Sequence, residues 1–275
     1  MEKVAATRLL ICGLFAVLCL FSCPATSSEV EDESEFSYEE DEKNGPSGWG
    51  EIKPEWRLCN TGKMQSPIDL LNKRVQVVSH LGALQMKYHP SNATLKNRGH
   101  DIMLEWAAGA GYLQINETQY ILRQCHWHSF SEHTIDGKRF DLELHMVHET
   151  EAGEAAVIGI LYKIGKPDAF LSSLRDDIKA ISDKTDAEEN VGIVDPWLIK
   201  PSSLRYYRYM GSLTTPPCTE NVVWTILAEV RTVSKKQVKL LRDAVHDGSE
   251  TNARPLQPIN NRLVELYKPK AYKKD

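Results

Sequence analysis

The sequence has no apolar stretch after residue 21 that is long enough to cross a bilayer. The one long apolar run, Leu9 to Phe21, is itself short for a membrane span and lies near residue 1. Basic residues precede this run and small residues follow it, which is typical of a secretory signal peptide over residues 1–27. We therefore expect a mature protein in solution, with an uncleaved membrane anchor as the alternative.

The chain also has no excess of basic residues, because its formal net charge is −5. Residues 1–27 carry a net charge of +1, so the net charge without them is −6. This charge offers no electrostatic basis for binding nucleic acid. Two charged runs stand out, an acidic arm over residues 28–43 and a basic tail over residues 268–275. Runs of this kind are normally solvated.

No internal repeat and no linker divides the body of the chain, so we expect a single domain over residues 36–267. Short alternating runs recur between Gly, Pro and Asn breaks, which indicates a sheet with mostly antiparallel strands. The expected strands are 83–88, 93–97, 101–106, 111–115, 119–128, 140–148, 155–163 and 222–230. Asp168–Ile181 and Ser234–Val245 are expected as packing helices with a polar loop between them. The predicted fold class is mainly β with peripheral helices.

Histidines mark the stretch that points to chemistry. Side chains alternate between the two faces of a strand, so in the run Gln124–His128 the imidazoles of His126 and His128 share one face. Further along, Glu143 and His145 share a face in the same way, and a neighbouring strand could bring His145 to the same point. A lone histidine is more often an ordinary core or surface residue. Three imidazoles without a fourth protein ligand are typical of a catalytic zinc site rather than a structural one.

Three of the six cysteines fall in the signal segment, which leaves Cys59, Cys125 and Cys218. In an oxidising compartment this odd number predicts one disulfide and one free thiol. Cys125 lies on the strand face opposite the proposed ligands and is expected to be the buried free thiol. We therefore predict a disulfide between Cys59 and Cys218. N-glycosylation sequons at Asn92 and Asn116 are consistent with the secretory pathway.

Five separated motifs, taken together and in order, resemble the α-class carbonic anhydrases. They are Gln65–Asp69, Gln124–His128, Ser131–Thr134, Glu143–His148 and Ser212–Pro217. The Cys-His-Trp-His sequence that begins at Cys125 and the run Asn97–Asp101 are similar to the plant branch of that family. Any single motif would be weak, whereas five in order across the domain are specific.

This resemblance implies a ten-stranded, mostly antiparallel central sheet with Zn²⁺ at the bottom of a conical cleft, held by His126, His128 and His145. It also implies reversible hydration of carbon dioxide to bicarbonate and a proton by a zinc-bound hydroxide. In that family zinc lowers the pKa of its bound water to about 7. Neutral ligands favour this ionisation because they leave the charge of the ion uncancelled.

The resemblance further implies roles for neighbours of the ligands. Gln124, Glu143 and a backbone carbonyl would orient the ligand imidazoles. Thr214 would donate its hydroxyl proton to Glu132 and accept a hydrogen bond from the hydroxide, and Thr215 would contact bicarbonate more weakly. An apolar wall for uncharged carbon dioxide, equally compatible with core packing, would comprise Val147, Val157, Leu213, Val222 and Trp224.

His100 matches the proton shuttle of the family, because a histidine with an ordinary pKa near 6.5 can accept and release a proton at physiological pH. Tyr38 is expected to line the water chain, which would order the arm around it. Arg98 stands where the animal pattern commonly has Asn, and a cation there is expected to disfavour protonated His100. His133 and His148 are expected to make structural hydrogen bonds.

Two other functions stay open at this point. Some plant relatives have lost zinc ligands and serve as storage or binding proteins on the same fold, but the intact ligands argue against this role here. A different zinc hydrolase with esterase activity is the other alternative. The signal segment predicts the extracellular space or cell wall, or a chloroplast location reached through the secretory route.

Overall fold

The computed structural model describes residues 35–182, 184, 186–199, 204–245 and 251–269. The predicted signal peptide, residues 28–34 of the acidic arm and residues 270–275 of the basic tail lie outside the described residues. Within the described ranges, no helix combines the length and apolar composition that crossing a membrane requires.

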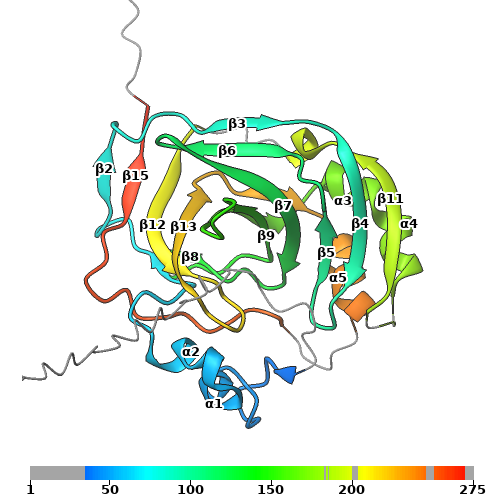
Figure 1. Cartoon of the computed structure of the whole chain (residues 1–275), viewed down its shortest axis with the longest axis horizontal. Helices are drawn as coiled ribbons and strands as arrows, with labels where there is room; N and C mark the ends of the chain where they lie inside the picture. The colour runs from blue at the N-terminus through cyan, green and yellow to red at the C-terminus, as the bar shows by residue number, and fades with distance from the viewer. Residues whose placement is uncertain (1–34, 183, 185, 200–203, 246–250, 270–275) are drawn as a thin grey trace, which may run out of the picture.

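A large, curved β-sheet forms the body of the protein (Figure 1). Ten strands cross it in the order β11 (Glu188–Val194), β4 (Ser91–Asn97), β5 (Ile102–Glu105), β7 (Thr118–His128), β9 (Leu142–Glu149), β10 (Ala155–Ile164), β13 (Glu220–Leu227), β12 (Tyr206–Ser212), β15 (Glu265–Tyr267) and β2 (Gln76–Val78). Three strands flank this path: β3 (Gln85–Tyr88), β6 (Gly111–Ile115) and β14 (Arg231–Val233). In the described part of the sheet, pairing is parallel for β10 with β13, β10 with β14 and β15 with β2, and antiparallel elsewhere. The expected large central sheet is confirmed, but it has thirteen strands within the described residues, ten of them on one path, and it is mixed, with parallel pairs beside the more numerous antiparallel ones.

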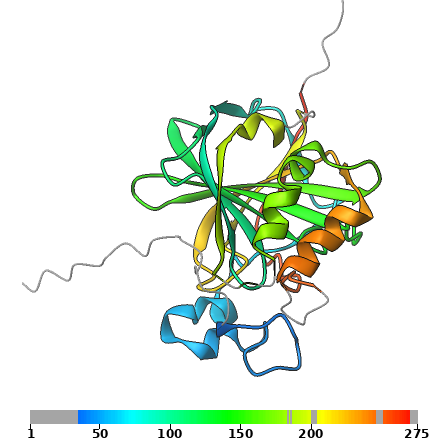
Figure 2. The ribbon, with the colours of Figure 1, turned by 90° about the vertical axis from the view of Figure 1, so that its right-hand side faces the viewer.

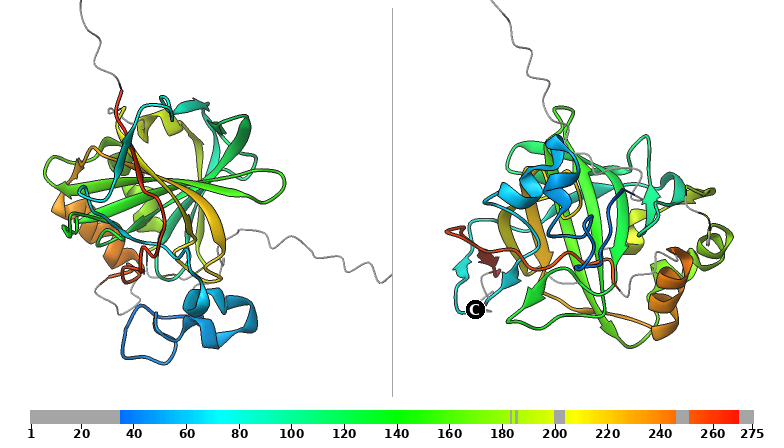
Figure 3. Two further views of the ribbon diagram at one scale, coloured as in Figure 1. Left: turned by 90° about the vertical axis from the view of Figure 1, so that its left-hand side faces the viewer. Right: turned by 90° about the horizontal axis from the view of Figure 1, so that it is seen from below.

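The remaining elements are short and lie at the periphery. A separate parallel pair joins β1 (Asp69–Leu70) to β8 (Thr134–Ile135). The helical elements are α1 (Trp49–Ile52), η2 (Pro54–Trp56), α2 (Leu58–Thr61), α3 (Ala169–Ser173), α4 (Arg175–Ala180), η3 (Pro196–Ile199) and α5 (Lys235–Val245). Figure 2 shows α4 and α5 over one face of the sheet, whereas α1 and α2 lie together beyond one end of it (Figure 3). The mainly β class with peripheral helices is confirmed.

The two predicted helices are present, but the first is divided. Leu174 separates α3 from α4, because its backbone (φ −95°, ψ 1°) leaves the helical region. Asp168 begins α3 by accepting a hydrogen bond from the Leu171 amide at 3.0 Å. Ser234 caps α5 as predicted, because its Oγ accepts from the Gln237 amide while the Gln237 side chain accepts from the Ser234 amide.

The expectation of a polar loop between these helices is partly wrong, because the stretch contains β11, η3 and β12. β11 lies at the edge of the sheet, and most of its side chains are exposed or half-buried. Its sequence from Glu188 therefore carries little of the apolar alternation that marks a strand buried on one face.

Both faces of the central sheet are buried. On β10, Ile158 and Ile160 belong to the hydrophobic cluster that includes residues of α3, α4 and α5, whereas Val157 and Leu161 belong to a cluster on the opposite face. Burial of both faces explains the nearly continuous apolar sequence of β10. The second cluster contains all five residues predicted for the apolar wall: Val147, Val157, Leu213, Val222 and Trp224.

The segment before the sheet packs through a third cluster, which contains Phe36, Tyr38, Trp49, Trp56 and both cysteines of the disulfide. Part of the acidic arm is therefore packed against the domain. The predicted disulfide between Cys59 and Cys218 is present, with an S–S distance of 2.07 Å. Cys125 is buried with a free thiol, as predicted.

His148 lies on the core side of β9, fully buried, opposite in direction to His145. Its Nε2 lies 2.7 Å from the Tyr88 hydroxyl and its Nδ1 lies 3.1 Å from the carbonyl oxygen of Ala156. The structural hydrogen bonds expected for this residue are therefore present. Burial lowers the pKa of His148 to about 4.

This lowered pKa predicts a loss of stability in mild acid. Between pH 6.5 and about 4 the unfolded chain binds a proton at His148 and the folded chain does not. The free energy of unfolding should therefore fall by about 1.4 kcal/mol per pH unit as the pH drops through this window. Urea unfolding of wild type and His148→Gln, both in chelator, would show a stability difference that shrinks towards pH 4.

The matched control is His80→Gln, because the His80 side chain is 68% exposed. It should leave the pH dependence of stability as in wild type. A His148→Gln variant with the same pH dependence as wild type would contradict the prediction.

Candidate metal and active site

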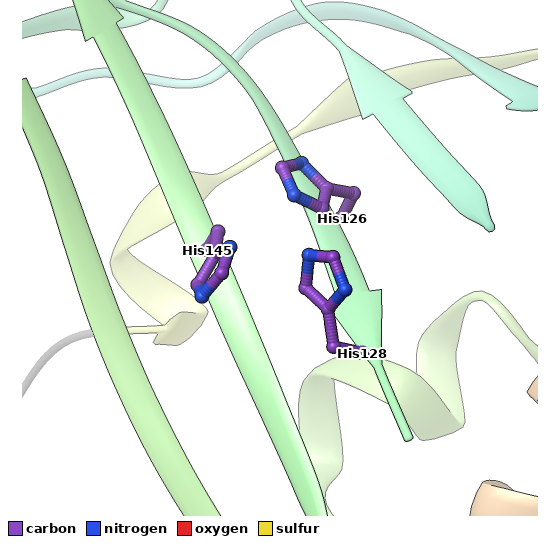
Figure 4. A group of neighbouring side chains, drawn as sticks. All are labelled: His126, His128 and His145. Carbon is purple, nitrogen blue, oxygen red and sulfur yellow. The ribbon is translucent and has the colours of Figure 1, made fainter. Parts of the chain in front are cut away.

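Two adjacent strands bring three histidines to one point. β7 and β9 pair antiparallel with His126 opposite His145, and His128 follows His126 on the same face. The three side chains are at most 1% exposed. One ring nitrogen from each lies within 4.8 Å of the others, and Figure 4 shows the rings converging between the two strands. The juxtaposition predicted from strand parity is confirmed.

A second ring nitrogen of each histidine is already engaged. The contacts are His126 Nδ1 to Gln124 Oε1 at 2.8 Å, His128 Nδ1 to the Asn252 carbonyl oxygen at 2.8 Å, and His145 Nε2 to Glu143 Oε1 at 2.9 Å. Each partner atom is an acceptor, so each engaged nitrogen carries the proton and the other nitrogen keeps its lone pair. Nε2 of His128 is buried without a hydrogen-bond partner. Three lone pairs of this kind fit a zinc ion that retains an open coordination position.

A buried carboxylate lies beside these nitrogens. Glu132 is 0% exposed, and its Oε2 lies 3.7 Å from Nε2 of His128 and 4.0 Å from Nδ1 of His145. Oε1 accepts a hydrogen bond from the Arg254 amide at 2.9 Å, whereas Oε2 is buried without a partner. Glu132 therefore has an open acceptor position next to the histidine cluster.

The environment sets the charge of two site residues. Burial acts to lower the pKa of His128, but the Glu132 carboxylate and the bond to Asn252 raise it above the usual value. Protons would compete with a metal for this imidazole, so metal affinity should fall in acid. Burial acts to raise the pKa of Glu143, but the two histidines beside it lower the pKa well below the usual value.

The loop after β12 carries Thr214 and Thr215, each 1% exposed. Cys218 anchors this loop twice, through the disulfide to Cys59 and through its amide, which donates to the Thr215 carbonyl at 2.9 Å. Oγ1 of Thr215 is buried without a hydrogen-bond partner. Among the described residues, Thr214 and Glu132 share no hydrogen bond, so that predicted link stays a prediction.

Trp224 brings the cluster of predicted wall residues into contact with the histidines. Trp224 has its ring centroid 4.8 Å from that of His145, and its indole nitrogen donates to the Ser212 carbonyl at 2.9 Å. Val157 lies next to Trp224 through the parallel pairing of β10 with β13. The five wall residues therefore lie in one buried cluster, which contacts His145 through Trp224.

His100 is packed under the arm. Its Nε2 lies 2.6 Å from the Phe36 carbonyl oxygen, and its ring centroid lies 5.2 Å from those of Phe36 and Tyr38. The expectation of an unbalanced cation beside it needs correction, because Arg98 forms a buried ion pair with Asp101. The pKa of this carboxyl is lowered, since the Arg98 charge and hydrogen bonds outweigh the raising effect of burial.

Three contributors to the site were missed in the sequence. Asn252 supplies the carbonyl that holds His128, Arg254 supplies the amide that holds Glu132, and Tyr209 contacts His133. Asn252 and Arg254 lie in a stretch without regular secondary structure. No local periodicity marks them, although the expected backbone carbonyl indicated that such a partner exists.

Comparison with known proteins places this geometry in a family. Residues 44–268 match the family model described as eukaryotic-type carbonic anhydrase. Alpha carbonic anhydrase 7 of Arabidopsis thaliana is 57% identical over 257 residues, 94% of each chain, and dioscorin dioA3 of Dioscorea japonica is 48% identical over 245 residues, 89% of this chain and 90% of that one.

Solved structures agree. A crystal structure of dioscorin complexed with ascorbate superposes with a TM-score of 0.83 at 46% identity, covering 86% of this chain and 98% of that chain. The alpha-carbonic anhydrase from Thermovibrio ammonificans in complex with the inhibitor sulfanilamide gives a TM-score of 0.76 at 34% identity, covering 84% and 98%. The chain therefore belongs to the eukaryotic-type carbonic anhydrase family.

Proposed function

We propose that this protein is a carbonate dehydratase, which catalyses the reversible hydration of carbon dioxide to bicarbonate and a proton with Zn²⁺ held by His126, His128 and His145. The observation that carries the proposal is the set of three buried imidazoles whose other nitrogens are already hydrogen-bonded. In carbonic anhydrases, zinc supplies a water of pKa about 7.

The residues around the ligands orient them. Gln124, Glu143 and the Asn252 carbonyl would hold each of the three rings in the tautomer that a metal ligand requires. In this proposal the Thr214 hydroxyl donates to the open Oε2 of Glu132, which leaves a lone pair of Thr214 directed at the reacting oxygen. Glu132 and Thr214 thus act as a pair.

The kind of surface that would bind the substrate follows from the lack of charge on carbon dioxide. Carbon dioxide has no charge and no donor, so a low-polarity surface suits it better than hydrogen-bonding groups. Leu213, Val222 and Trp224 supply such a surface together with Val147 and Val157. The Thr215 hydroxyl, buried without a partner, would bind an oxygen of bicarbonate.

His100 is the proposed carrier of the released proton. Because His100 contacts the Phe36 carbonyl and packs against Tyr38, the arm would lie beside this proton route. Because Arg98 is paired with Asp101, its charge is balanced and does not argue against this role.

We propose that the protein enters the secretory pathway. A disulfide and the relation to plant alpha carbonic anhydrases support it, and the predicted signal over residues 1–27 would direct it. Asn92 and Asn116, the proposed glycosylation sites, are both exposed. The proposed final location is the extracellular space or cell wall, or alternatively the chloroplast reached through the secretory route.

The deciding experiment is zinc content together with carbon dioxide hydration of the mature protein purified from a secretory host. We expect one zinc per chain and hydration that a chelator abolishes and zinc restores. A zinc-free, inactive protein would overturn the proposal and favour a storage or binding role on the same fold, which the dioscorin relationship keeps as the alternative. Ester hydrolysis faster than hydration would favour a different zinc hydrolase.

A further inference from the structure

A buried series of hydrogen bonds runs from the histidine cluster to a tyrosine outside it. The steps are His145 Nε2 to Glu143 Oε1 at 2.9 Å, Glu143 Oε1 to His133 Nδ1 at 2.8 Å, His133 Nε2 to the Tyr209 hydroxyl at 2.7 Å, and that hydroxyl to Ser66 Oγ at 2.8 Å. Every side chain in this series is at most 2% exposed. Water therefore does not substitute for a missing partner.

The donors and acceptors have one consistent assignment. Nδ1 of His133 faces the Glu143 carboxylate and carries a proton, so Nε2 of the neutral ring is an acceptor. The Tyr209 hydroxyl therefore donates to Nε2 of His133. Burial raises the pKa of Tyr209 well above that of an exposed phenol, so this proton is retained. Ser66 Oγ accepts from the Ser212 amide at 3.1 Å and donates to Tyr209.

The residues around this series of hydrogen bonds are closely packed against it. A Cβ at Gly159, the residue opposite His145 on β10, would lie 2.9 Å from Oε1 of Glu143 and 2.5 Å from Cδ1 of Ile226. A Cβ at Gly211 would overlap Oγ of Ser66. Trp224 covers the series, with its ring 4.8 Å from both His133 and His145.

We infer that Tyr209 is a positioning residue for the proposed zinc ligand His145, acting through His133 and Glu143. By donating to His133 it holds that ring against Glu143, and Glu143 in turn holds His145 with its lone pair on Nδ1. This inference rests on the proposed function, because it gives His145 the role of a metal ligand. Groups that orient a ligand directly change metal affinity about 10- to 100-fold, and Tyr209 acts from two residues further out.

The test is zinc affinity, measured by competition with a chromophoric chelator, together with the zinc dissociation rate. Tyr209→Phe removes one oxygen and keeps the ring. We expect it to weaken zinc binding about 3- to 10-fold and to speed dissociation correspondingly. In a Glu143→Gln background, adding Tyr209→Phe should weaken zinc binding by less than about 2-fold. The reason is that Tyr209 acts on His145 through Glu143, which is already altered in that background.

The matched control is Tyr207→Phe. Tyr207 lies on the same strand and face, is also a buried residue, and donates its hydroxyl to Oδ1 of the exposed Asn72 at 2.9 Å, away from the histidines. Tyr209→Phe should lower the urea midpoint of the zinc-free protein more than Tyr207→Phe, because it leaves the buried Nε2 of His133 without a donor, and only Tyr209→Phe should change zinc affinity. Equal zinc affinities of wild type and Tyr209→Phe, or equal losses in both variants, would overturn the inference. A wild type that binds no zinc would instead overturn the proposed function.

Discussion

Replacement of His128 by alanine is expected to abolish carbon dioxide hydration and to weaken zinc binding about 10³-fold. Zinc binding by protein sites is worth on the order of 10–16 kcal/mol, and loss of one of three ligands removes roughly 4 kcal/mol of it. The carboxylate beside this nitrogen, Glu132, has its Oε1 held by the Arg254 amide, and an oxygen is a poorer replacement for the lost imidazole nitrogen. Metal analysis after dialysis and stopped-flow hydration would measure both effects.

The control for this variant is His80→Ala, which removes an exposed imidazole outside the cluster and should keep zinc and activity. Near-ultraviolet circular dichroism of zinc-free wild type and His128→Ala would show whether the fold is retained. A folded His128→Ala protein with full zinc content and full activity would eliminate the ligand assignment.

Removal of the disulfide is expected to have the largest effect on stability. Replacing Cys59 and Cys218 together by serine should lower the free energy of unfolding by about 2–5 kcal/mol, because the bond closes a loop with a sequence separation of 159 residues. Activity should fall as well, since Cys218 anchors the loop that carries Thr214 and Thr215. Urea unfolding and hydration assays would measure the two losses.

Reductant provides the control for the disulfide prediction. It should destabilise the wild type towards the level of the double variant and leave the double variant unchanged. Cys125→Ala, which alters the buried free thiol, should keep the sensitivity to reductant. Equal stability of wild type and double variant under oxidising conditions would show that the bond contributes nothing.

Much of the site follows from local pattern. Strand parity placed His126 and His128 on one face and gave His145 the same face as Glu143, because the direction of a side chain on a strand depends only on its position along it. The odd count of cysteines with Cys125 on the opposite face led to the observed disulfide. The unexpected strand β11 shows the limit, because an edge strand with polar side chains has no such pattern.

The register that joins the two histidine strands could not be predicted. Leu122 pairs with His148, but Gln124 pairs with Val147, so a bulge at Arg123 shifts the pairing by one residue. Without this shift His126 would lie opposite Leu144, and side chains directly opposite each other share a face. The bulge therefore brings His145 to the other two ligands.

The sequence by itself determined the residue types of the site, the faces on which they lie and the family that they resemble, because these depend on local order and alternation. Tertiary structure alone decided the strand register and the partners that hold the ligands. Asn252 is 124 positions from His128, and Tyr209 is 76 positions from His133. Contacts over such separations depend on how the whole sheet closes, and no local periodicity records them.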